Sequence, residues 1–229
     1  MNPSAGEFWR GVRAEAPILL SVIPFGLFFG ALAVEAGIPI STSQAMSAII
    51  FAGASQLLAV QLIAAGSSSL IMLLVVFVVN LRHALYSASV APHMKMLSRV
   101  WKMLLAYLLT DEAYAVAITH YNRQDGSPER KHWFFLGAGL TLWTTWQLST
   151  AMGLLIGAQI PSDWPLPFVL PLTFIALVVP ALKDKASLIS AVSAGVIGLL
   201  AVSLPLKTGL LAASLVGILA GVVSEGKAK

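Results

Sequence analysis

Long runs of the sequence carry almost no charge, and this feature constrains the fold more than any other. Glu35 is the only charged residue in Ala16–Leu81, and Asp163 is the only one in Trp133–Leu182. Two further runs, Ala186–Leu206 and Thr208–Ser224, carry none. At roughly 1.5 Å per helical residue, the first run is long enough to cross a hydrocarbon core of about 30 Å three times. The sequence therefore predicts a helical protein that crosses a membrane several times.

The composition excludes several other classes of protein. Only 10% of the residues are charged, whereas a soluble domain carries about 25%. A transmembrane β-barrel would alternate polar and apolar residues along each strand, and these runs do not. The chain has no cysteine, which excludes disulfides, iron–sulfur clusters and thiol catalysis. The net charge of +4 comes from Lys and Arg residues that flank the apolar runs, so it does not indicate nucleic-acid binding.

Eight hydrophobic segments can be distinguished, and they predict an all-α polytopic membrane protein with about six to eight transmembrane segments. The segments are 16–36, 44–65, 69–81, 103–121, 133–158, 166–182, 186–205 and 208–224. We treat residues 1–229 as a single integral membrane domain. Gly30–Pro39 resembles Gly153–Pro161, which suggests an internal repeat with halves at about 16–121 and 133–224. The alternative is that stretches rich in Gly, Ala and Leu match by chance.

The distribution of Lys and Arg indicates that two of these segments do not cross the membrane. Eight plain crossings from a cytoplasmic N-terminus would place the cations of 82–102 outside, against the positive-inside rule. If one of the first three segments and 103–121 both fail to cross, only Lys207 remains outside. Non-helical backbone at membrane depth must be buried in protein or line a cavity. The best candidates for the broken stretches are Gly53–Gln56 and Thr110–Glu112, and 44–65 contains the first of them.

Two adjacent carboxylates, Asp111 and Glu112, stand in the middle of the segment 103–121. A charged residue at the centre of a spanning helix costs roughly 2.5–3.5 kcal/mol on insertion scales. One interpretation is a cation site or a proton relay. The other is a carboxylate that caps the N-terminus of a half-helix, where the helix dipole favours it.

A second polar group, Asn80-Leu-Arg82-His83-Ala-Leu-Tyr86, follows the most apolar run of the chain. Arg82 could hold a carboxylate through its two-pronged guanidinium, with hydrogen bonds from Asn80 and Tyr86, and His83 could titrate near neutral pH. The alternative is an ordinary membrane boundary with Tyr86 in the aromatic belt.

Ser55 and Gln56, in Phe51–Gln56, place a hydroxyl and an amide among small residues. They predict either an unwound stretch that faces a substrate or close helix packing. Three glycine pairs four residues apart, Gly26/Gly30, Gly153/Gly157 and Gly217/Gly221, predict helix contact faces within the chain or toward a partner subunit.

The sequence contains no motif for ATP hydrolysis, zinc proteolysis or an activated serine. The four histidines share no helical face, so we expect neither a metal site nor a cofactor.

Four motifs in order resemble the AzlC/YgaZ family over nearly the whole chain: Pro24–Gly30, Phe51–Gln56, Asn80–Tyr86 and Thr110–Glu112. The resemblance implies the large subunit of a bacterial branched-chain amino acid exporter in the cytoplasmic membrane. It also implies valine, leucine or isoleucine as substrate, with methionine in some members, and a small hydrophobic partner of the AzlD/YgaH type. No site residues are carried over from the family.

We therefore expect a secondary exporter of aliphatic amino acids, with Arg82 binding the substrate carboxylate and Asp111 or Glu112 its ammonium group. Proton coupling through Asp111, Glu112 or His83 is consistent with this expectation. The alternatives are a passive channel, a subunit that does not itself transport, and, with the least support, an intramembrane enzyme.

Overall fold

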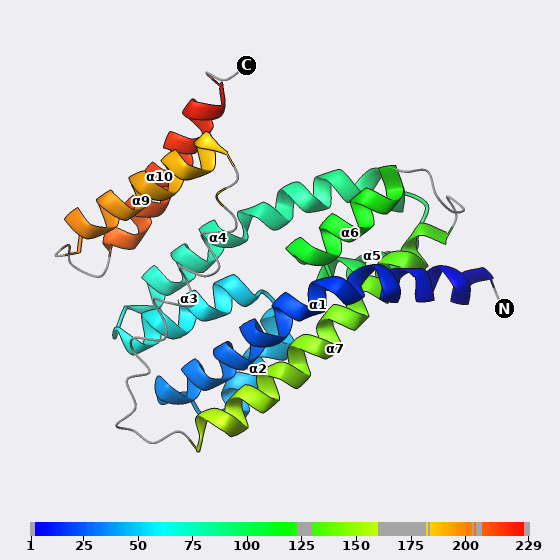
Figure 1. Cartoon of the computed structure of the whole chain (residues 1–229), viewed down its shortest axis with the longest axis horizontal. Helices are drawn as coiled ribbons and strands as arrows, with labels where there is room; N and C mark the ends of the chain where they lie inside the picture. The colour runs from blue at the N-terminus through cyan, green and yellow to red at the C-terminus, as the bar shows by residue number, and fades with distance from the viewer. Residues whose placement is uncertain are drawn as a thin grey trace. The chain divides into compact units, whose positions relative to one another are not determined.

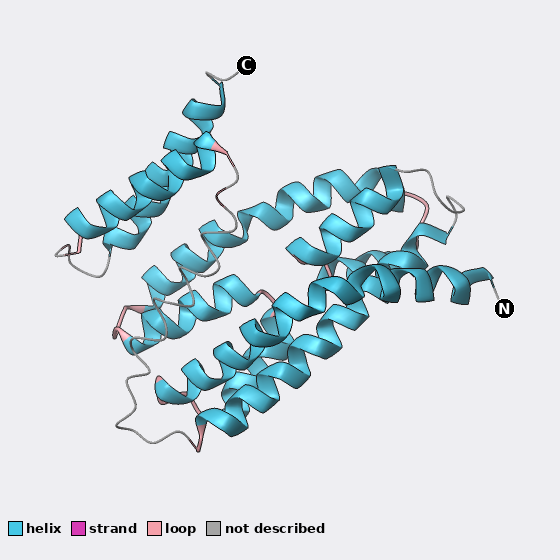
Figure 2. Cartoon of the chain, viewed as in Figure 1, coloured by secondary structure: helices cyan, strands magenta, loops and turns pink. Residues whose placement is uncertain are grey.

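The computed structural model describes residues 3–122, 130–159, 182, 184–202, 204 and 208–226. Every regular element among these residues is a helix (Figure 2). The elements are α1 (Pro3–Glu35), α2 (Ile40–Ile50), α3 (Gly53–Ala64), α4 (Ser69–Val90), η1 (Ala91–Met94), α5 (Arg99–Tyr107), α6 (Asp111–Asn122), α7 (Lys131–Gly157), α9 (Lys185–Leu200) and α10 (Thr208–Gly226). The predicted all-α class is confirmed. The expected segment 166–182 lies outside the described residues, apart from Leu182.

Within the part of the chain that the structure describes, two helices are long and apolar enough to cross a membrane. They are Ser4–Glu35, with a mean hydropathy of 2.2, and Ser69–Met94, with 1.9. Shorter apolar helices lie at Gly53–Ala64, Lys185–Leu200 and Ala212–Glu225. Many large apolar side chains are exposed, including Leu73, Phe77 and Leu85 on α4. Since water would penalise such a surface, these side chains are suited to contact with lipid.

The described chain forms two compact units. One contains Met1–Ala64 and Val76–Ile160, and the other contains Ala65–Val75 and Pro161–Lys229. In the second unit α9 and α10 form an antiparallel pair. Gly217 packs against Ala194, and Gly209 packs against Ala201. Asp184 caps α9 by accepting a hydrogen bond from the Ser187 backbone at 2.7 Å, and the hydrogen bonds from Ser187 hold the pKa of Asp184 below its usual value.

The first unit is built on a close parallel pair of helices, α1 and α7 (Figure 1). A Cβ atom at Gly30 would lie 2.5 Å from the backbone of Thr150 and Leu154, and one at Gly153 would meet the backbone of Leu27. The two helix backbones therefore touch where glycine removes the side chain. The glycine faces predicted on 26/30, 153/157 and 217/221 are all occupied within the chain, so they do not provide a docking face for a partner.

The contacts between α1 and α7 bear on the predicted repeat. In the sequence match, Gly30 corresponds to Gly153, and on the same alignment Leu27 corresponds to Thr150. Gly30 packs on Thr150, and Gly153 packs on Leu27, so the two contacts are images of each other. Such reciprocity is what a two-fold axis parallel to the helices would produce. The repeat halves themselves stay a prediction, because much of the second half lies outside the described residues.

The predicted segment 44–65 is broken into α2 and α3 at Phe51 and Ala52. Phe51 has φ 42°, in the left-handed region, and it ends α2 while its backbone N–H still bonds to Ser47. A bulky residue rarely adopts this conformation, so the surrounding packing must hold it there. In Figure 1 α2 runs inward from the end of α1 and α3 doubles back, so the pair enters the bundle and leaves on the same side.

The predicted segment 103–121 is likewise broken, into α5 and α6, by the turn Leu108–Thr110. Its two outer ends meet again beside the start of α7. Near the start of α5, Trp101 lies 4.8 Å from His132 between ring centroids, and at the end of α6 the Tyr121 hydroxyl donates to the Lys131 carbonyl at 2.9 Å. The segment therefore does not cross as one straight helix, as the charge distribution predicted. Which side of the membrane is cytoplasmic stays a prediction.

The expected end of the third segment near residue 81 is wrong, because α4 continues to Val90. Arg82 and His83 therefore lie within a long apolar helix, and the interpretation that they stand at a membrane boundary stays a prediction. The polar side chains Asn80 and Arg82 find partners on the neighbouring helices α3 and α6.

Replacing Gly30 with alanine should destabilise the first unit. The added Cβ meets backbone atoms that cannot rotate away, and overpacking of this kind typically costs about 1–3 kcal/mol. Gly6→Ala, on the same helix with nothing within 4 Å, is the matched control. Thermal unfolding of the purified protein should show a lower midpoint for Gly30→Ala than for Gly6→Ala, and equal midpoints would contradict the packing described here.

Single cysteines at Ser98 and Asn122 should be labelled from the same side of the membrane. The chain has no native cysteine, and both positions are exposed at the outer ends of α5 and α6. An impermeant maleimide should label both only after the cells are opened, since this side is predicted to be cytoplasmic. Labelling of one position from outside and of the other only after opening would refute the doubling back of α5 and α6.

Candidate functional site

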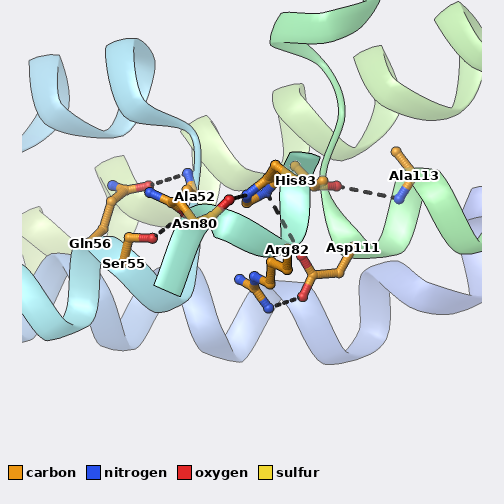
Figure 3. Close-up of polar contacts among 9 residues, drawn as sticks. Ala52, Ser55, Gln56, Asn80, Arg82, His83, Asp111 and Ala113 are labelled. Carbon is orange, nitrogen blue, oxygen red and sulfur yellow. Dashed lines mark hydrogen bonds and ion pairs between the residues drawn. The ribbon is translucent and has the colours of Figure 1, made fainter. Parts of the chain in front are cut away.

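The middle of α4 carries polar side chains that bond to the start of α3. The Ser55 hydroxyl donates to the side-chain oxygen of Asn80 at 2.6 Å. His83 Nδ1 lies 3.2 Å from the backbone carbonyl of Asn80, to which it can only donate. This contact uses Nδ1, and Nε2 is the ring nitrogen that faces Asp111. Figure 3 shows these side chains in one line across the gap between the helices.

An ion pair joins α4 to the start of α6. The Arg82 guanidinium donates to Asp111 Oδ2, and His83 Nε2 lies 3.9 Å from Asp111 Oδ1 (Figure 3). The Arg82 and Asp111 side chains are about one-third exposed, at 32% and 35%. The Nε atom of Arg82 is buried and has no hydrogen-bond partner among the described residues. The pair therefore offers a positive and a negative group together, with one donor still unused.

Tyr86 extends this cluster by ring contacts and makes no ion pair. Its ring lies 5.8 Å from that of His83 and stacks on Tyr114 of α6 at 4.4 Å between centroids. The Tyr114 hydroxyl donates to Ser89 at 3.0 Å. The tyrosines thus fix α4 against α6 one turn beyond the ion pair. The expected hydrogen bond from Tyr86 to a ligand stays a prediction.

Gln56 has a structural task at the break between α2 and α3. Its side-chain oxygen accepts from the Ala52 backbone N–H at 3.1 Å, which caps the start of α3. Its Nε2 atom is buried without a partner among the described residues. Gln56 therefore caps α3 with one end of its amide, which neither interpretation expected, and a contact of the other end with a substrate stays a prediction.

Asp111 and Glu112 occupy the first turn of α6, and the Thr110 hydroxyl accepts from the Ala113 backbone N–H at 3.3 Å. Carboxylates are favoured at a helix N-terminus by its dipole. The two acids therefore lie where the helix dipole favours a carboxylate, but the side chain that caps α6 is that of Thr110. The two side chains point to different neighbours: Asp111 pairs with Arg82 of α4, whereas Glu112 interacts electrostatically with Glu15 of α1.

The two breaks lie against each other. The Tyr107 hydroxyl, at the end of α5, donates to the backbone carbonyl of Ala48, and its ring lies 6.0 Å from that of Phe51. The N-termini of α3 and α6 thus come to the middle of the unit from opposite sides. Discontinuous helices that meet in this way expose backbone groups and helix dipoles at membrane depth, as in the binding sites of many transporters.

Glu15 is a polar residue of this region that the charge pattern did not single out. The hydrophobic segment was expected to begin at residue 16, so Glu15 counted as a flanking charge. The helix in fact begins at Pro3, and Glu15 is fully buried at 0% exposure. Only the packing of α1 on α6 reveals this burial. The one available signal was that Glu15 directly adjoins the apolar run.

An apolar cavity of about 370 Å³ lies beside the break between α5 and α6. Its walls include Val90, Met94, Leu105, Leu109 and Phe135, and Lys95 and Lys102 contribute to its lining. Leu109 belongs to the break itself and stands two residues before Asp111.

Five of the eight predicted site residues form one connected network in the structure: Ser55, Asn80, Arg82, His83 and Asp111. Tyr86 packs at its edge, Gln56 caps the adjoining helix, and Glu112 faces α1. Among the described residues no group of three or more metal-ligating side chains is found.

Comparison with known proteins identifies the family. The sequence pattern of the family described as AzlC protein matches residues 17–160. The chain belongs to the AzlC family. It is similar to the inner membrane protein YgaZ of Escherichia coli, with 32% identity over 87% of this chain and 82% of the relative.

Uncharacterized membrane proteins of Archaeoglobus fulgidus and Helicobacter pylori are also similar to it. They share 32% identity over 92% of both chains and 30% identity over 75% of both chains, respectively. No solved structure matches. An AzlC-family membrane protein has a role associated with membrane transport, and the candidate site lies within the residues that the family pattern covers.

The Arg82–Asp111 pair should show strong coupling in a double-mutant cycle. Arg82→Gln alone leaves a carboxylate without its partner, and Asp111→Asn alone leaves an unpaired guanidinium, so each should lower the thermal midpoint. The double variant should be no less stable than the worse single variant, because it removes both charges. Additive losses in the double variant would show that the pair contributes nothing as a pair.

Proposed function

We propose that this protein is a secondary transporter that exports the branched-chain amino acids valine, leucine and isoleucine across the cytoplasmic membrane of a bacterium, with methionine as a further substrate. The observation that carries this proposal is the Arg82–Asp111 ion pair at the meeting point of two broken segments. An amino acid is a zwitterion, and its two charges are complementary to the two charges of this pair.

The chemistry of the exchange follows from the groups present. The substrate carboxylate can bind the two-pronged guanidinium of Arg82, whose Nε atom has no partner among the described residues. The substrate ammonium can bind Asp111, whose Oδ1 atom lies toward His83. Each charge of the pair thus exchanges one partner for another, so neither is left unpaired in a low-dielectric setting. The proposal accounts for a costly ion pair inside a membrane protein.

The aliphatic part of the substrate needs an apolar space next to these charges. The cavity of about 370 Å³ is the candidate for this space: the ion pair does not line it, and Leu109, two residues before Asp111, links it to the start of α6. Its volume accommodates a branched side chain of four carbons or fewer with room to spare. This supports aliphatic substrates over charged ones.

We also propose a small hydrophobic partner of the AzlD/YgaH type. The glycine faces at 26/30, 153/157 and 217/221 pack against helices of the same chain, so they are not open to this partner. The exposed apolar residues of α4 leave ample surface for a partner or for lipid.

Arg82→Lys should weaken the apparent affinity for valine by about tenfold or more, since hydrogen bonds to charged groups are worth roughly 1.5–3 kcal/mol and lysine lacks the fork. Arg99→Lys, at an exposed position on α5, is the matched control. Valine counterflow in proteoliposomes, with and without the small partner, measures the effect. Flux that does not saturate with valine would favour a channel, and unchanged affinity in Arg82→Lys would remove Arg82 from the site.

A further inference from the structure

Glu15 is a fully buried carboxylic acid that has no role in the substrate binding proposed above. It lies in α1 at 0% exposure, and neither of its oxygens has a hydrogen-bond partner among the described residues. An ionised carboxylate in such surroundings pays a large desolvation cost, whereas a protonated one pays far less. An ionisable residue of this kind inside a membrane helix commonly marks an ion or proton pathway.

The register of α1 against α6 places Glu112 and Glu15 at the same height along the two helices. Near one end of the contact between the helices, Glu7 Oε2 lies 3.6 Å from His120 Nε2. Eight residues further along α1 is Glu15, and eight residues back along α6 is Glu112. Eight residues are about two turns in each helix, so two helices packed antiparallel bring both pairs to matching heights. The electrostatic interaction between Glu15 and Glu112 agrees with this register.

Few other titratable groups can reach Glu15 from the helices that pack on α1. Helices α2 and α3 carry none, and α7 carries only Lys131 and His132 in its first turn. On the α6 side Glu112 is next to Asp111 and also feels the charge of Arg82. Glu15 is therefore linked to the Arg82–Asp111 pair through Glu112.

We propose that the Glu15–Glu112 pair holds one exchangeable proton, without a hydrogen bond between the two, and that this proton is the ion exchanged for the substrate. The inference rests on the proposed function and adds the coupling ion and its residues. Two neighbouring carboxylates in a low-dielectric site cannot both ionise, so the pair keeps a proton. A proton fits where a hydrated metal ion does not, because essentially no surface of Glu15 is open to a probe the size of water.

Substrate and proton then compete for the same negative charge. When the substrate binds, its ammonium replaces Arg82 at Asp111 and lies nearer to Glu112 than its carboxylate, which Arg82 holds, and this orientation favours the ionised form of the pair. The proton leaves Glu15–Glu112 as the amino acid arrives, and it returns when the amino acid departs. Because only one of the two occupies the site at a time, each crossing of substrate in one direction is matched by a proton in the other.

Infrared spectroscopy of the purified full-length protein tests for the proton of this pair without any substrate. A protonated carboxylic acid has a C=O band above the amide region that shifts in heavy water. We expect this band at neutral pH in the unsubstituted protein, a change in its frequency or intensity in both Glu15→Gln and Glu112→Gln, and no change in Glu35→Gln. Glu35 is an exposed acid on the same helix and so is the matched control. Absence of the band, or an unchanged band in either Glu15→Gln or Glu112→Gln, would overturn the proposal.

Proton release tests the coupling. Adding valine to the unsubstituted protein or to Glu35→Gln in weak buffer should acidify the solution, while Glu15→Gln should release at least tenfold less. Valine binding is followed in parallel with radiolabelled valine. If valine does not bind but the infrared band depends on Glu15, the proposed substrate fails and the carboxylate pair stands. If valine binds without Glu15-dependent proton release, the coupling fails and the proposed function stands.

Discussion

The structure depends on one constraint: inside a membrane, polar groups must find their partners within the protein. Two apolar segments of the first unit are broken near their middles, and each break exposes backbone and side-chain polar groups. Tyr107 bonds across from one break to the other, and Gln56 and Thr110 cap the helices that restart. Polar side chains in the middle of α4 bond to residues beside the same two breaks: Asn80 to Ser55, and Arg82 to Asp111. The candidate site is the place where these polar groups come together.

The parallel pair of α1 and α7 provides the frame on which the breaks are held. Glycines at the crossing let the two backbones touch, which gives a rigid contact without a large side chain. Both breaks use this frame: α2 bonds to α7 through Ser47 and Thr150 at 3.2 Å, and α6 pairs with α1 through His120 and Glu7. Broken helices on a rigid support can move and change the side of the membrane from which the site is reached, while the support stays in place.

The charges of the unit form one series from α1 to α4. Glu112 acts electrostatically on Glu15, Asp111 and Arg82 act on Glu112, and Asp111 forms an ion pair with Arg82. A change of charge at one end is felt at the other because the intervening medium screens poorly. Three acids and one arginine are an unusual content for a membrane interior, and their continuity gives a physical route by which binding at Arg82 and protonation at Glu15 influence each other.

Sequence alone determined the membrane class, the family resemblance and most of the site. Charge-free runs can only be stable in lipid, and the positions of Lys and Arg require that 103–121 turn back, as α5 and α6 do. The sequence also singled out Thr110–Glu112 and Gly53–Gln56, because unsatisfied polar groups are costly wherever the fold places them. The tertiary structure decided what periodicity cannot show. It extended α4 through Arg82, where polar side chains find partners on α3 and α6. It paired Arg82 with Asp111, 29 residues away, and buried Glu15 completely. These features depend on which helices pack together, and a residue's burial is set by neighbours that are distant in the chain.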